Sequence, residues 1–138
     1  MRDRLNTRNL LRRKHMFLED YSCVMCNQGC EETSLHLFFE CSFGKECRES
    51  IPIIWEMNLN PLDMILQARM NFGSVIFREI LITACWILWN TRNSIIFDNG
   101  HKNLQVWKRQ FKDELGLVCT KAKPSISAAI NSWKESYM

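Results

Sequence analysis

Four cysteines and one histidine lie within the nineteen residues CVMCNQGCEETSLHLFFEC, at positions 23–41. Cys23 and Cys26 form a CxxC pair, His36 follows after nine residues, and Cys41 follows after four more. Three thiolates and one imidazole are the ligand set and the ligand number of a closed, tetrahedral structural zinc site. The spacing therefore predicts a CCHC-type finger in which these four residues hold one structural Zn²⁺ ion.

Two other interpretations of the same residues stay open. Cys30 could replace one of the four ligands, although its position after Gly29 in a loop would let it turn away from the ion. Alternatively, the cysteines are buried reduced thiols and the histidine is a satisfied core residue, because a free cysteine packs like a small hydrophobe. The remaining cysteines are interpreted as packing residues: Cys47, Cys85 and Cys119.

The elements that must position these ligands are predicted to be helices. Thr33 is expected to cap a short helix with the sequence SLHLFFE, which carries His36 and leads to Cys41. Asn60 and Pro61 are typical of an N-cap followed by proline at the first helical position. The apolar side of the helix that they open is expected to consist of Leu62, Ile65, Leu66 and Met70.

Three more helices are predicted downstream. A long helix is expected over residues 74–97, with Ile80 and Trp86 inside and Arg78 and Glu79 toward solvent. Its apolar run of ten residues is about half of the roughly 20 that cross a bilayer, so we expect a buried helix and no membrane partner. Apolar residues at helical spacing predict another helix over 104–118, and a last helix is expected over 125–137, after Pro124.

Length and composition predict one compact domain of mostly α class. At 138 residues and 46% hydrophobic, the chain can bury one core of ordinary size. Residues 1–60 are expected to form the zinc-binding part, and residues 61–138 a helical extension packed in the same unit. Because Met1 is followed by an arginine-rich stretch and not by an apolar signal segment, we expect reduced thiols and no export.

Charge is distributed unevenly along the chain. Residues 1–14 hold six basic side chains and one acidic side chain, whereas residues 15–60 hold two basic and eight acidic ones. Any contact with nucleic-acid phosphates is therefore expected at the cationic ends, because phosphate attraction dominates such binding. The candidate residues for this contact are Arg8, Arg12, Arg13 and Lys14, and the alternative is that they form a solvated helix face.

Two motifs resemble a known family. The segments RLNTRNLLRRK, CVMC and EETSLHLFFECSF are similar to the zinc-binding domain that follows the polymerase in reverse transcriptases of plant LINE-type (non-LTR) retrotransposons. Further on, WILWNTRNSIIF at 86–97 resembles a Trp-x-x-Trp-x-x-Arg-Asn-x-x-x-Phe helix that these elements carry downstream. The resemblance covers roughly residues 4–57 and 84–112, and it implies a zinc-binding module that stands apart from its polymerase.

The sequence offers no catalytic motif. The five aspartates are scattered and form no paired magnesium site, and there is no nucleophile motif or glycine-rich phosphate loop. We therefore expect no enzyme and no small-molecule substrate. The family's domain normally begins with an earlier aromatic-rich helix, and its absence from this chain is expected to expose apolar surface.

Two classes of function follow from these features. The first is a protein-interaction module or regulator, whose partner is another protein or a second copy of the chain. The second is an RNA- or DNA-binding module retained from a LINE reverse transcriptase. The tryptophans are candidates for the exposed surface, although Trp107, at helical spacing, is expected in the core. The nucleus or the cytoplasm is the expected location, and the arginine-rich start leaves the mitochondrion as an alternative.

Overall fold

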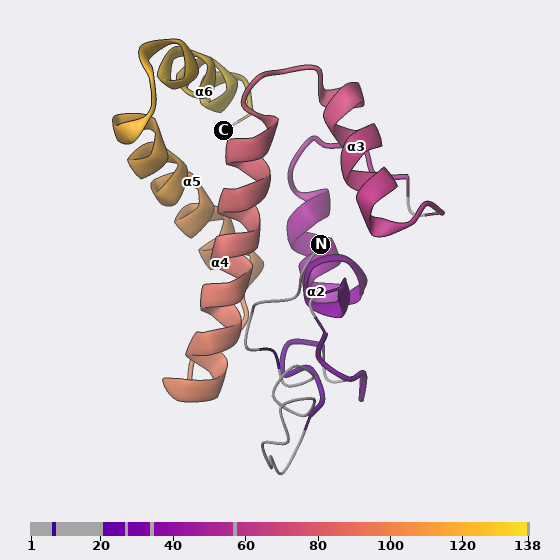
Figure 1. Cartoon of the computed structure of the whole chain (residues 1–138). Coiled ribbons are helices and arrows are strands. Elements are labelled where there is room, and N and C mark those ends of the chain that lie inside the picture. The colour runs from indigo at the N-terminus through magenta and orange to yellow at the C-terminus, as the bar shows by residue number, and fades with distance from the viewer. Residues whose placement is uncertain (1–6, 8–20, 27, 34, 57, 138) are drawn as a thin grey trace.

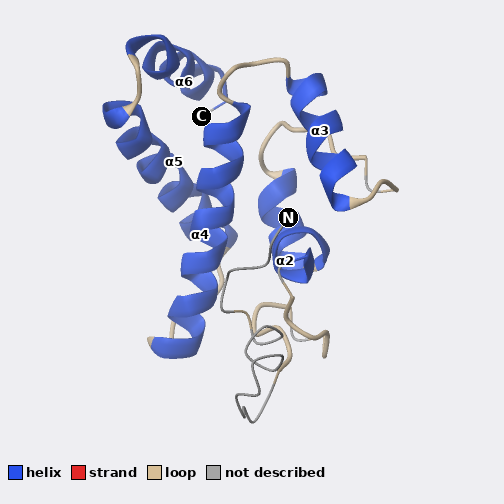
Figure 2. Ribbon diagram, viewed as in Figure 1, coloured by secondary structure: helices blue, strands red, loops and turns tan. Residues whose placement is uncertain are grey.

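A computed structural model describes residues 7, 21–26, 28–33, 35–56 and 58–137. Among these residues the fold is mostly helical and contains no strand, which confirms the predicted class (Figure 2). A short π-helix, η1 (His36–Glu40), leads into α2 (Ser42–Glu49). The helices that follow are α3 (Pro61–Phe72), α4 (Phe77–Phe97), α5 (Leu104–Lys121) and α6 (Pro124–Tyr137).

The core lies where α4, α5 and α6 meet α2. Figure 1 shows α4 beside α5, with α6 folded back across the far end of α5, and α2 contacts both α4 and α5. Trp107 and Phe111 of α5 stack with ring centroids 5.3 Å apart, and Ile80 of α4 and Ile130 of α6 are fully buried. Trp107 is therefore a core residue, as its spacing predicts.

Local side-chain contacts explain where two helices begin. Asn60 Oδ1 accepts a hydrogen bond from Asp63 N–H at 3.0 Å, and Pro61 occupies the first position of α3, as the sequence predicts. Asn103 caps α5 in the same way by accepting from Val106 N–H at 3.1 Å. At the other end of α3, Gly73 has φ +66, a left-handed conformation that ends the helix without steric strain.

The apolar side predicted for α3 is not the side that the fold buries. Leu62, Leu66 and Met70 are exposed, whereas Met64 and Ala68 are buried. At the end of α3, the Phe72 ring packs against two other aromatic rings. Its centroid lies 5.9 Å from that of Phe77 and 6.5 Å from that of Trp133. Met64 and Ala68 thus lie on the covered side of α3, and the apolar row at 62, 66 and 70 lies on a side that is exposed.

The predicted orientation of α4 is half right. Ile80 is buried and Arg78 is exposed, but the side chain of Trp86 is 49% exposed and does not lie in the core. The buried side of α4 contains Thr83 and Ile87, three and seven residues after Ile80. Trp86 follows Ile80 by six residues, which at 3.6 residues per turn places it about 240° around the helix. Because the sequence around Trp86 is apolar on every side of the helix, its pattern does not show which side is buried.

Length and apolar composition would allow α4, among the helices described, to cross a membrane. Many core helices of soluble proteins share these two properties. Here α4 packs against α5 and buries the charged side chain of Arg92, whose partner lies in the N-terminal finger. Of the apolar window of α4, 28% is buried inside the structure.

Candidate metal centre

Residues 21–26 and 28–32 form the two sides of a narrow hairpin that presents the CxxC pair. Cys23 N–H donates a hydrogen bond to Cys30 O at 2.8 Å, and Glu32 N–H donates to Tyr21 O at 2.9 Å. The chain turns at residues 24–26, between the outgoing segment with Cys23 and the returning segment with Cys30. Gly29 has φ +74, a left-handed conformation that glycine adopts at no steric cost. The hairpin thus fixes Cys23 and Cys26 on one short turn.

The π-helix explains how two ligands five residues apart reach one point. In an α-helix, side chains at i and i+5 differ by about 140° around the axis, because each residue turns about 100°. The wider turn of η1 instead closes a hydrogen bond from Cys41 N–H to His36 O at 2.6 Å. Thr33 Oγ1 accepts from His36 N–H at 2.9 Å, as expected of the residue that caps this helix.

The four predicted ligands meet in space. Their donor atoms all lie within 4.8 Å of one another, and no side chain among them is more than 7% exposed. The Sγ atoms of Cys23 and Cys41 are 3.9 Å apart, and Cys26 Sγ lies 3.4 Å from His36 Nε2. Around a tetrahedral ion with Zn–S near 2.3 Å and Zn–N near 2.0 Å, two sulfur ligands lie roughly 3.8 Å apart, and a sulfur and a nitrogen ligand lie roughly 3.6 Å apart. The cluster therefore fits a single metal ion.

The electrostatics of the cluster favour a thiolate at Cys41. The pKa of Cys41 is lowered mainly because the Cys23 thiol donates a hydrogen bond to it, and backbone N–H groups of Gly44 and Phe43 add to this effect. The same hydrogen bond and burial raise the pKa of Cys23. Cys41 also precedes the first turn of α2, where the helix dipole favours negative charge. A metal ion would take the place of the proton that the two sulfurs share.

A buried ion pair joins the hairpin to α4. Arg92 donates from Nη2 to Glu32 Oε1 at 2.7 Å and from Nε to Glu32 Oε2 at 3.0 Å, across 60 residues of sequence. The guanidinium also lies 4.6 Å from the centroid of the Trp89 ring. Sequence reasoning missed this pair, although a signal exists, because Arg92 is the only charged residue between Glu79 and Asp98.

Two further cations hold backbone carbonyls of the finger. Arg48 Nη1 of α2 donates to the carbonyl oxygens of Phe38 and Phe39, at 3.2 and 3.0 Å, near the end of η1. Lys102, in the loop before α5, donates from Nζ to Met25 O inside the CxxC turn. Carbonyls at such positions lack helical partners, so these contacts position the segments that carry the ligands.

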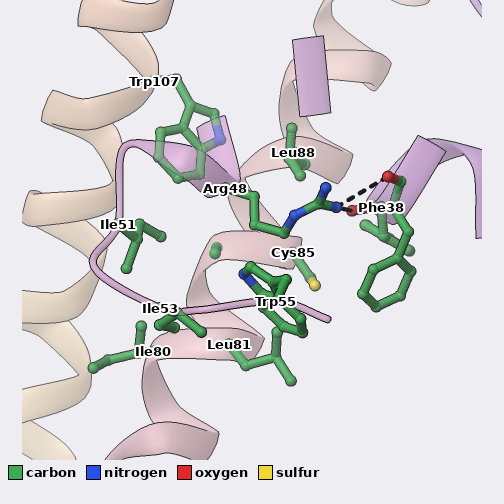
Figure 3. A pocket seen from close by; sticks show the side chains of 12 residues that line it. Phe38, Arg48, Ile51, Ile53, Trp55, Ile80, Leu81, Cys85, Leu88 and Trp107 are labelled. Atoms are coloured by element: carbon green, nitrogen blue, oxygen red, sulfur yellow. Dashed lines mark hydrogen bonds between the residues drawn. The ribbon is translucent and has the colours of Figure 1, made fainter. Parts of the chain in front are cut away.

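A small cavity lies behind Arg48, between α2, α4 and α5 (Figure 3). Its volume of about 30 Å³ is enough for a few water molecules and far below the hundreds of Å³ of a typical ligand pocket. Burial lowers the pKa of Arg48 and raises the pKa of Cys85, which also lines the cavity, to about 12. This space is a feature of the core and offers no site for an organic ligand.

The other candidate residues fall outside the cluster. Cys30 is exposed, and the four-donor group does not include it. Cys47 is fully buried and packs in the core, as predicted, while Cys85 and Cys119 are half-buried. The proposed phosphate-binding residues Arg8, Arg12, Arg13 and Lys14 lie outside the described residues.

Comparisons with known proteins add no relative to this description. No family model matches the chain, and neither the curated proteins nor the solved structures contain a match.

Proposed function

We propose that this protein is a non-catalytic zinc-finger module that binds another protein through the exposed apolar side of α3. Zinc is the proposed metal because the cluster offers three thiolates and one imidazole that are close together and buried. Four such ligands complete the tetrahedral coordination of a structural Zn²⁺ ion. Four protein ligands leave no open coordination position for a substrate or a reactive water. The role proposed for the ion is therefore structural.

The exposed apolar row on α3 is the observation that carries the proposal. Leu62, Leu66 and Met70 repeat every four residues along one side of the helix, and their side chains are between 48% and 75% exposed. Ile54 before the helix and Val75 after it are also exposed. Such a row is typical of a helix that lies in the groove of a partner or pairs with another helix.

The ends of α3 suit pairing with an antiparallel helix, including that of a second copy. Asp63 lies in the first turn and Arg69 in the last turn, so an antiparallel partner would bring opposite charges together. A two-fold axis at Leu66 would place Leu62 of one copy at the level of Met70 of the other. A homodimer is thus one form of the proposed interaction.

We also propose that the module derives from a LINE-type reverse transcriptase. The support is the resemblance of two sequence segments and the contact between them. Glu32 belongs to the first segment and Arg92 to the second, and the two side chains form the buried ion pair. Because a side chain of one segment pairs with a side chain of the other, the two segments are expected to occur together in one folding unit, as they do in the family that they resemble.

The test replaces the row and leaves the finger intact. The variant Leu66→Gln/Met70→Gln should abolish self-association in sedimentation velocity and lose the proteins that copurify with the tagged chain. The matched control is Phe97→Gln/Leu117→Gln, which changes two exposed apolar residues on α4 and α5. Because apolar contacts are insensitive to screening, association should persist when salt rises from 50 to 200 mM. Equal loss in both variants, or no loss in either, would refute the role of α3.

A further inference from the structure

The outer side of α5 carries a row of cations that the proposed function does not use. Lys108, Arg109 and Lys112, with Gln105 and Tyr137, line a hollow of about 360 Å³ between α5 and the end of α6. No acidic side chain lines this hollow. Its lining therefore combines three positive charges with two neutral polar groups.

A second hollow continues the first and shares Lys112 with it. The second hollow has a volume of about 390 Å³ and is also lined by Asn131, Lys134 and Glu135. Lys134 of α6 lies close to α5, because its Nζ is 3.5 Å from the position of a Cβ built on Gly116. The two hollows meet at Lys112, and their combined lining, named the α5–α6 groove, has four cations and one carboxylate.

Packing of α5 fixes the direction of this row. Trp107, Phe111 and Leu115 repeat every four residues and bury one side of the helix in the core. The cations at 108, 109 and 112 are consequently held at the surface, where all three are exposed. The groove thus depends on the same amphipathic pattern that builds the core.

The four cations are unpaired within the described part of the chain. The two ion pairs found there join Lys45 to Glu49 and Arg92 to Glu32, both away from α5 and α6. Clustered like charges repel one another, and a positively charged surface in a hollow concentrates anions from solution. The groove is therefore suited to an anionic ligand.

We propose that the α5–α6 groove binds the phosphodiester backbone of single-stranded nucleic acid. Four cations spread over two hollows that share Lys112 fit successive phosphates of a chain better than one small anion. At one end, the ring of Tyr137 lines the groove and stacks on Trp133, with centroids 4.7 Å apart. Cations that follow the backbone beside an aromatic ring are the usual elements of single-strand binding.

This inference goes beyond the proposed protein interaction and does not depend on it. The groove lies on α5 and α6, whereas the apolar row lies on α3. It also differs from the expectation that Arg8, Arg12, Arg13 and Lys14 carry phosphate binding. Each of these surfaces can be changed alone, so their contributions are separable.

The experiment measures fluorescence anisotropy of a labelled 12-nucleotide oligouridylate, and of oligothymidylate, with the full zinc-loaded chain. The groove variant is Lys108→Ala/Arg109→Ala/Lys112→Ala. The matched control is Arg69→Ala/Lys121→Ala/Lys123→Ala, which removes the same charge from exposed cations outside the groove. Circular dichroism and zinc content should be unchanged in both, because every replaced side chain is exposed.

Three to four phosphate contacts predict that wild-type affinity falls about 20- to 50-fold between 50 and 200 mM salt, since each phosphate on a single strand contributes a slope of about −0.7. The groove variant should lose about 20-fold or more in affinity at 50 mM salt and flatten the slope by about 2. The control and Leu66→Gln/Met70→Gln should bind like wild type, even if the latter has lost its protein partner.

Three outcomes would overturn the proposal. Equal losses in the groove variant and its control would show attraction by net charge alone. Loss on replacing Arg8, Arg12, Arg13 and Lys14, with none in the groove variant, would place binding at the N-terminal segment. Displacement of the oligonucleotide by polyglutamate at equal charge concentration would show a groove that accepts acidic peptides without preference for phosphates.

Discussion

The buried pair between Glu32 and Arg92 gives the sharpest test of how the finger is attached. The perturbation is Arg92→Met, which keeps much of the side-chain length beside Trp89 and removes the guanidinium. Glu32 is 0% exposed and Arg92 is 4% exposed, so water cannot replace the lost partner. The variant would leave a carboxylate buried with its two guanidinium hydrogen bonds gone.

The expected loss of stability is large for a domain of this size. Removing one partner of a buried ion pair costs about 3–5 kcal/mol, compared with a total unfolding free energy of about 5–15 kcal/mol. At a chain length of 138 residues this corresponds to a fall in Tm of roughly 10–20 °C. The double variant Glu32→Met/Arg92→Met should recover most of the loss, because apolar residues of similar volume often replace such pairs at little cost.

The assay is thermal and urea unfolding with zinc in excess. Lys45→Met is the matched control, because Lys45 and Glu49 form an exposed pair at 4.0 Å that should contribute less than about 1 kcal/mol. The reasoning fails if Arg92→Met is no more destabilising than Lys45→Met. It also fails if the double variant is less stable than Arg92→Met, since the penalty would then not come from the buried carboxylate that has lost Arg92.

Metal analysis should find one zinc ion per chain, with zinc lost in Cys41→Ala and retained in Cys30→Ala; the reverse pattern would move the site to the alternative ligand. Chelation should lower Tm and release the finger, while most helical circular dichroism from α4, α5 and α6 remains. Iodoacetamide at pH 8 should label the exposed Cys30 and spare Cys47, because Cys47 is fully buried and its burial also raises the pKa of its thiol; peptide mass mapping would decide. Trp107→Ala should destabilise the fold by about 3–5 kcal/mol and Trp86→Ala by much less, and equal unfolding curves would contradict their different burial.

The ligand cluster was predictable because its information is local. All four donors lie within nineteen residues, and their types and spacing are constrained by the coordination of one ion. The cap at Asn60 and the buried side of α5 were predictable for the same reason, since each depends on neighbours within one or two helical turns. The π-helix between His36 and Cys41 was not, because no side-chain pattern distinguishes it from an α-helix.

The orientation of α3 and α4 required information from distant residues. Trp86 lies in an apolar run whose every face could be buried, and the packing of α5 decides which one is. The row at Leu62 and Leu66 is as apolar as the buried side of a core helix, yet the fold leaves it exposed. Periodicity identifies an apolar side of a helix, but it does not identify what covers that side.

The metal and the helices stabilise the finger in different ways, which explains why chelation should affect its parts unequally. The ion would join the four ligands to one another, but none of them comes from α4, α5 or α6. The finger meets the rest of the fold through core packing and through three cations that contact it directly: Arg92 of α4 at Glu32, Lys102 before α5 at the CxxC turn, and Arg48 of α2 at the end of η1. Without the ion these cations hold segments whose own geometry is no longer fixed. The core of α5 and α6 buries Trp107 and Ile130, and this burial does not involve the metal ligands, so we expect it to stay folded after the ion is removed.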